Sequence, residues 1–186
     1  MKAIAVASML ALAAPPAEGQ QPRPPAGSAR AVAERVLGAL SRKDAPGFAR
    51  DVHPEAIADF RANVIQVLEQ SPTPEQRTQG LQFFGGARSL EEFKRVPADQ
   101  VFVAYMRRVF EQMNAAGNLR VTNTILGEVP EGPNTAHVLY RARVTAGKDS
   151  ATNIAVLSLR RSPGGWKALL SGDLQALNGP RPQPPR

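Results

Sequence analysis

The hydrophobic and polar positions of the chain follow two different periods. From Ser28 to Ala115, apolar residues recur every three or four positions, as they do on one face of an α-helix. From Leu119 to Leu170, apolar and polar residues alternate, which is typical of strands with one buried face. We therefore predict an α+β fold in which N-terminal helices pack on a curved antiparallel sheet of about four C-terminal strands.

Capping residues and prolines divide the helical half. Ser28 precedes the first amphipathic segment, Pro54 suits the first position of a helix, and Thr73 and Ser89 are suitable N-caps. Between the first two long segments, the stretch from Phe48 to Val52 is expected to form one short apolar turn of helix. The predicted longer helices are Ser28–Lys43, Pro54–Gln70, Pro74–Phe84, a segment from Ser89, and Ala98–Ala115.

Turn residues separate the alternating segments of the last third. Val129–Asn134 (VPEGPN), Gly147–Asp149 and Ser162–Gly165 are rich in glycine, proline and asparagine or aspartate, and are predicted turns. The predicted strands are Leu119–Ile125, His137–Thr145, Asn153–Arg161 and Trp166–Ser171.

The two ends of the chain differ from the region between them. Met1-Lys2, the apolar run Ala3–Ala14 and the small residues of Ala17-Glu18-Gly19 form the pattern of a signal peptide cleaved before Gln20. The alternatives are a disordered alanine-rich tail or an uncleaved anchor, although the run is shorter than the roughly 20 apolar residues that span a bilayer. The predicted organisation is a signal peptide (1–19), a Pro-rich linker (20–27), a single domain (28–178) and a disordered Pro-rich tail (179–186).

Composition narrows the location and the partners. The pattern at residues 1–19 predicts a periplasmic or extracellular protein with no stable membrane anchor. The absence of cysteine excludes disulfides, thiolate metal sites and a lipid anchor on cysteine. The net charge of +7 is spread along the chain, with no run of more than two basic residues, so we expect no nucleic-acid partner.

Three parts of the chain carry a family resemblance: the helix Val32–Leu40, the segment Lys43–Val52 (KDAPGFARDV), and the block from Thr135 to the Gly165-Trp166-Lys167 strand. In these parts the chain resembles a secreted bacterial member of the nuclear transport factor 2-like superfamily, a group with a cystatin-like α+β fold. That superfamily includes SnoaL-like cyclases, ketosteroid isomerases and scytalone dehydratase. The resemblance implies a cone-shaped domain with an apolar cavity between sheet and helices. Glu75–Met113 departs from it, because this segment is helical where small members usually place a hairpin.

Candidate catalytic residues follow from the same resemblance. Enzymatic members place a carboxylate base and a hydrogen-bond donor for an oxyanion in an apolar pocket. The residues of these types are Asp51, Asp59 and Tyr105. Carboxylates on amphipathic helices usually face solvent, so a structural role is favoured for both. His53 and His137 are far apart in the sequence and form no metal-binding pattern, and we expect no metal or cofactor.

Aromatic residues are the candidate lining of a cavity. The pair Phe83-Phe84 stands out because it precedes the flexible Gly85-Gly86 at a predicted helix end. On the second predicted strand, Arg141 and Arg143 share a face with His137, where they would meet an anionic group or solvent. The candidate ligand-binding residues are Phe83, Phe84, Phe102, Tyr140 and Trp166.

These features favour an exported, non-catalytic binding protein. Its apolar cavity would hold a small apolar or amphipathic ligand, or would bind a protein partner, and a ligand site needs about 300 Å³ or more. One alternative is a SnoaL- or isomerase-type enzyme that uses a carboxylate base in that cavity. The other is a structural or accessory homodimer whose sheet faces pair.

Overall fold

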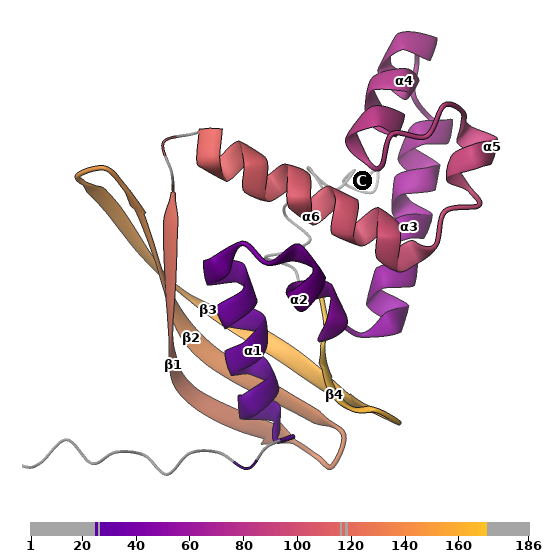
Figure 1. Cartoon of the computed structure of the whole chain (residues 1–186). Helices are drawn as coiled ribbons and strands as arrows, with labels where there is room; N and C mark the ends of the chain where they lie inside the picture. The colour runs from indigo at the N-terminus through magenta and orange to yellow at the C-terminus, as the bar shows by residue number, and fades with distance from the viewer. Residues whose placement is uncertain (1–24, 26, 116, 118, 171–186) are drawn as a thin grey trace, which may run out of the picture.

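The computed structural model describes Pro25, residues 27–115, Gly117 and residues 119–170. Within these ranges six helices precede a four-stranded antiparallel sheet, which confirms the predicted α+β order (Figure 1). None of the helices in these ranges combines the length and hydrophobicity that a membrane crossing needs. The predicted signal peptide, most of the predicted linker and the predicted tail lie outside the described residues.

Side chains at the N-caps fix where five of the helices begin. Ser28, Asp44, His53, Thr73 and Ser89 each accept a hydrogen bond from a backbone N–H in the first turn of the helix that follows. The boundaries of the longer helices agree with those predicted to within about two residues, the uncertainty of any helix end, whereas the short helix begins at Ala45, three residues before the predicted Phe48. The helices are α1 (Ala29–Arg42), α2 (Ala45–Arg50), α3 (Pro54–Glu69), α4 (Pro74–Phe83), α5 (Leu90–Phe93) and α6 (Ala98–Ala115).

The strands are β1 (Arg120–Glu131), β2 (Thr135–Ala146), β3 (Asp149–Ser162) and β4 (Gly165–Ala168), and they lie side by side in chain order. β1 continues through Val129 and Pro130, which we had predicted to belong to a turn. A proline is tolerated there because β1 is an edge strand, where a missing N–H leaves no ladder bond unmade. The turn itself is confined to residues 132–134.

Only part of the helical half covers the sheet. α1 packs on one face and contacts all four strands, as the prediction requires. α3 and α4 instead pack along α6, α5 packs on α3, and these helices project away from the sheet (Figure 1). Their apolar stripes face α6 and one another, so they form a second layer that buries its own side chains.

Phe102 of α6 joins the two layers. Its ring stacks on Phe48 of α2, with centroids 5.9 Å apart, and meets Phe60 of α3 edge-on at 5.3 Å. Phe48 and Phe102 are each 1% exposed. One side chain therefore contacts both the short helix α2 and the helix α3 of the outer layer.

Residues 51–53, between α2 and α3, close one edge of the sheet. Val52 forms a parallel bridge with Ala168 of β4. The Ala168 N–H donates to the Asp51 carbonyl and the His53 N–H donates to the Ala168 carbonyl, both at 2.8 Å. The edge of β4 is therefore paired, which protects it from pairing with another chain.

Replacing Phe102 by alanine should lower the free energy of unfolding by about 3–5 kcal/mol, because it leaves a cavity between the two layers. Urea unfolding followed by circular dichroism measures the change. Phe83→Ala is the control, since Phe83 is only half-buried and should cost clearly less. Equal losses in the two variants would contradict the role of Phe102 in joining the layers.

Candidate functional site

An apolar pocket opens between α3, α4 and α6, in the layer that projects from the sheet. Its volume is about 320 Å³. We call it the aromatic pocket, because four of its lining residues are aromatic. The lining residues are Phe60, Asn63, Val64, Val67, Phe83, Phe84, Tyr105, Val109 and Gln112.

Glycines in and after α4 bring Phe83 and Phe84 to this place. A Cβ on Gly80 would lie 2.5 Å from a methyl of Leu68, so any larger residue there would have to displace the buried Leu68 side chain. Gly85 and Gly86 then adopt positive φ angles of 145° and 77°, which end the helix and turn the chain back.

The aromatic rings form a connected cluster. Phe84 stacks on Tyr105 with centroids 5.8 Å apart, and Phe83 meets Phe84 edge-on at 5.1 Å. Phe60 lies 4.9 Å from the Tyr105 ring and links the cluster to Phe102. Burial raises the pKa of the Tyr105 hydroxyl above its ordinary value, so this group stays neutral at physiological pH.

The polar part of the lining is uncharged. Asn63 and Gln112 contribute side-chain amides, and the lining contains no acidic or basic residue. The pocket therefore offers flat apolar surfaces with a few hydrogen-bonding groups. It supplies no carboxylate for general base chemistry.

The predicted ligand-binding residues fall in three places. Phe83 and Phe84 line the aromatic pocket, together with Tyr105, while Phe102 lies in the core behind it. Tyr140 and Trp166 lie on the sheet and pack against the core, and the Trp166 ring has the Arg161 guanidinium over it at 5.5 Å.

The resemblance implied a cavity between sheet and helices, whereas the aromatic pocket lies within the outer helical layer. The reason is packing against the sheet. The buried side chains of Val138, Leu157 and Leu159 pack with those of α1, including Val32 and Val36, under the middle of the helix. The hollow that remains between α1 and β1, about 390 Å³, has a partly polar and charged lining.

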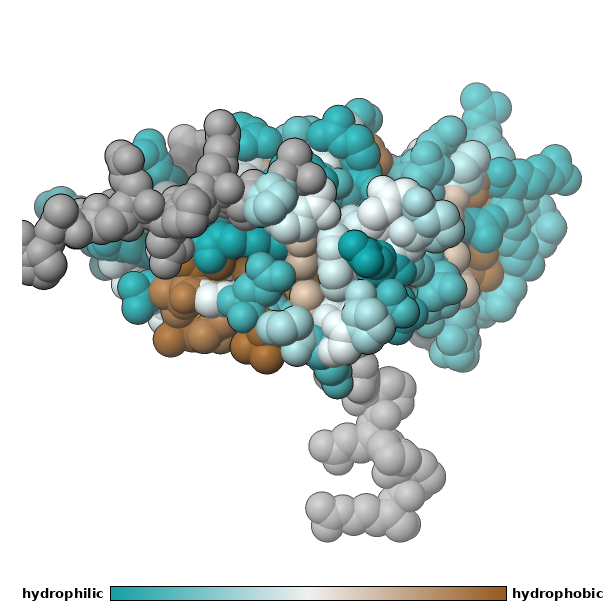
Figure 2. Space-filling model, turned by 90° about the horizontal axis from the view of Figure 1, so that it is seen from below, coloured by the Kyte–Doolittle hydropathy of each residue, from teal (hydrophilic) through white to brown (hydrophobic). Residues whose placement is uncertain are grey.

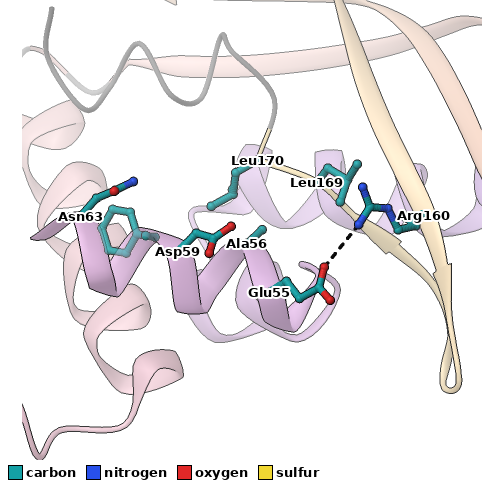
Figure 3. A pocket seen from close by; sticks show the side chains of 8 residues that line it. Glu55, Ala56, Asp59, Asn63, Arg160, Leu169 and Leu170 are labelled. Carbon is teal, nitrogen blue, oxygen red and sulfur yellow. Dashed lines mark hydrogen bonds and ion pairs between the residues drawn. The ribbon is translucent and has the colours of Figure 1, made fainter. Parts of the chain in front are cut away.

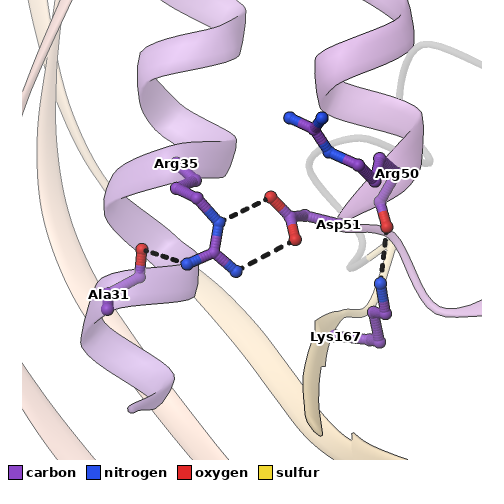
Figure 4. Close-up of polar contacts among 5 residues, drawn as sticks. All are labelled: Ala31, Arg35, Arg50, Asp51 and Lys167. Atoms are coloured by element: carbon purple, nitrogen blue, oxygen red, sulfur yellow. Dashed lines mark hydrogen bonds and ion pairs between the residues drawn. The ribbon is translucent and has the colours of Figure 1, made fainter. Parts of the chain in front are cut away.

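Asp51 is held in an ion pair. Both carboxylate oxygens accept hydrogen bonds from Arg35 of α1, at 3.0 and 3.1 Å, and Asp51 is only 5% exposed (Figure 4). The hydrogen bond to Asp51 raises the pKa of Arg35, burial opposes this rise, and the charge of Asp51 adds to it. Beside this pair, the Lys167 ammonium donates to the Arg50 carbonyl at 2.6 Å. Asp51 thus ties the end of α2 to α1, and it lies outside the aromatic pocket.

Asp59 borders a different, more polar cleft of about 230 Å³ (Figure 3). Glu55, one turn earlier on α3, pairs with Arg160 of β3 at 3.3 Å. The apolar part of the cleft is formed by Ala56, Phe60, Leu169 and Leu170. Asp59 is exposed and lies on the same helix as a second carboxylate. Its surroundings are therefore solvated rather than apolar, and it does not share a pocket with Tyr105.

The sheet brings together three residues that the sequence did not connect. His137 Nδ1 lies 3.0 Å from the Ser158 hydroxyl, and His137 Nε2 lies 2.8 Å from a Glu131 carboxylate oxygen. This order of groups matches a nucleophile–base–acid series. The nearby backbone N–H groups lie in the plane of the sheet and pair between strands, so they do not point to an oxyanion above the face. The strand register explains this trio, since His137 lies opposite Ser158, and Glu131, opposite Thr135, is diagonal to His137 on the same face.

The histidines and carboxylates do not assemble a metal site in the described part of the chain. Groups of three or more histidines or carboxylates with suitable geometry are absent there. His53 is used locally, where its Nδ1 accepts a hydrogen bond from the Glu55 N–H at 3.3 Å and caps α3.

Comparisons with known proteins add little to this description. No family model matches the chain, and no curated protein matches it. A solved domain of unknown function from Nostoc punctiforme, described as having a cystatin-like fold, is similar with a TM-score of 0.42 and 13% identity over 80% of each chain. Likeness at this level does not assign the chain to a family. The α+β class rests on the helices and sheet themselves.

Replacing Arg35 by alanine should lower the free energy of unfolding by about 1–3 kcal/mol, because the mostly buried Asp51 carboxylate loses its charged partner. Thermal or urea unfolding measures the loss. Arg108→Ala is a suitable control, since Arg108 pairs with Glu111 at the surface and such pairs contribute about 0–0.5 kcal/mol. A loss in Arg35→Ala no larger than in the control would show that the pair does not stabilise the fold.

Proposed function

We propose that this protein is a non-catalytic binding protein whose aromatic pocket holds a small, uncharged, amphipathic ligand. The observation that carries the proposal is the combination of an aromatic lining with amides as the polar lining groups. The pocket volume of about 320 Å³ lies at the lower end of the range for small-molecule sites. A ligand with one ring system or a short branched chain is the expected size.

The lining decides the chemistry of the ligand. A charged group would lose its hydration in the pocket, and the lining offers no opposite charge to compensate for that loss. The amides of Asn63 and Gln112 can pair with a hydroxyl, carbonyl or amide group of the ligand. Phe83, Phe84 and Tyr105 offer ring faces and edges for a flat apolar part.

The proposal also includes location and family. Export to the periplasm or the extracellular space is supported by the signal-peptide pattern of residues 1–19. Membership of the nuclear transport factor 2-like superfamily is supported by the helices-then-sheet order and by the Lys43–Val52 segment. Fold alone does not determine function, so the ligand is argued from the pocket.

Val67→Glu tests the pocket, because Val67 is 60% exposed at its lining and tolerates a polar side chain without loss of core packing. A carboxylate there should weaken binding of the neutral dye Nile red at least about tenfold, or ~1.4 kcal/mol. Dye fluorescence titration measures the affinity. Trp166 lies on the sheet outside the pocket, so its emission should stay unchanged on binding.

The matched control is Gln66→Glu, which adds the same charge at an exposed neighbouring position that is not part of the lining. This variant should bind the dye like the unmodified chain. Equal weakening in both variants would point to a general charge effect, and no weakening in Val67→Glu would refute the pocket as the binding site.

A further inference from the structure

The outer face of the sheet, opposite α1, carries exposed aliphatic side chains at its centre. In the space-filling view from below, hydrophobic residues gather in one patch rather than being scattered (Figure 2). We define the sheet-face patch by four residues, whose exposed fractions are 61% for Val129, 37% for Leu139, 55% for Ile154 and 43% for Val156.

Strand register makes the sheet-face patch contiguous. Leu139 of β2 lies directly opposite Val156 of β3, and Ile154 is two residues further along the same face of β3. On the other side of Leu139 lies Gly127, and Val129 follows it on the same face of β1. Outward positions of a half-buried antiparallel sheet are normally polar, so a patch of this kind marks a contact surface.

Basic side chains stand at both ends of the sheet-face patch. In one direction, Arg141 and Arg143 continue the outward row of β2, about 7 and about 13 Å from Leu139 along the strand. In the other direction, Arg160 occupies an outward position near the end of β3, with Lys167 beside it on β4. The aliphatic centre therefore lies between two groups of positive charge.

The carboxylates near this face do not offset that charge. Glu131 is the acidic residue at the outward positions of the four strands, and its carboxylate lies 2.8 Å from His137 Nε2. Glu55 of α3 pairs with Arg160 at 3.3 Å. Arg141 has no hydrogen-bond or ion-pair partner in the described part of the chain. The face therefore keeps a net positive charge, as the whole chain does with +7.

We infer that the sheet-face patch lies reversibly on the surface of an anionic lipid bilayer. The basic ends contact the lipid headgroups, and the aliphatic centre lies at the boundary between headgroups and acyl chains. Each basic residue near such a surface strengthens binding about fivefold. Attachment of this kind needs no membrane-spanning helix, and it does not depend on the aromatic pocket or on the function proposed for it.

The distribution of charge favours a lipid surface over a second copy of the chain. Two copies stacked face to face would place a basic end over a basic end, whichever ends meet, because Arg143 and Arg160 stand at opposite ends. Like charges facing each other across an interface reduce affinity. An anionic bilayer instead complements both ends at once and demands no matching shape from its partner.

Pelleting of the full chain with phosphatidylglycerol vesicles and with phosphatidylcholine vesicles tests the inference. The chain should pellet with the anionic vesicles and much less with the neutral ones, because the neutral headgroup carries no net charge. Added salt should weaken the binding, since it screens the attraction between exposed charges. Equal binding to both kinds of vesicle, or binding to neither, would overturn the inference.

Arg141→Gln combined with Arg143→Gln removes two exposed charges from one end of the patch. This variant should bind anionic vesicles at least about tenfold more weakly. The matched control is Arg95→Gln combined with Arg107→Gln, which removes two exposed charges from the outer helical layer and should bind nearly like the unmodified chain. Equal weakening in both variants would show an effect of net charge alone and would overturn the sheet face as the docking surface.

Ile154→Ser tests the aliphatic centre and should weaken binding to anionic vesicles several-fold, whereas Val67→Ser, at a similarly exposed aliphatic residue of α3, should not. Sedimentation velocity without vesicles tests the alternative occupant. A dimer that Ile154→Ser dissociates would assign the patch to a second copy and overturn the lipid surface. In the absence of vesicles, the variants at Arg141, Arg143 and Ile154 should still bind Nile red, which separates a failure of this inference from a failure of the aromatic pocket.

Discussion

The contact of Phe102 with Phe48 and Phe60 is the interaction on which the arrangement of the molecule depends. α1 covers the sheet and α2 packs on α1, whereas α3 and α4 pack on α6 and α5 packs on α3, with few contacts to the sheet. The two layers hold together where α6 meets α2, and Phe102 supplies the buried aromatic surface at that place. Aromatic side chains suit this task because each buries a large area with only two rotatable bonds.

This arrangement explains why the pocket lies in the outer helical layer and not over the sheet. The inner face of the sheet is covered by α1 and sealed at the β4 edge by residues 51–53, and the Asp51–Arg35 pair holds that segment against α1. Buried apolar side chains occupy the middle of this layer. In the outer layer, three helices meet around Tyr105 at angles set by Gly80 and the Gly85-Gly86 turn, and their aromatic rings leave a concave surface.

Features decided by neighbours in the sequence were predictable, and features decided by distant contacts were not. The side chains of Ser28, Thr73 and Ser89 each accept a hydrogen bond from the backbone N–H three residues later in the chain. The local sequence pattern was therefore enough to locate the starts of these three helices. The alternation of Val138 and Leu139 likewise revealed a strand with two unlike faces. Asp51 could not be assigned its partner, because Arg35 lies sixteen residues away on another helix. The sequence indicated Phe83, Phe84 and Tyr105 as separate candidate site residues. It did not show that they lie apart from Tyr140 and Trp166, because that depends on which helices pack together.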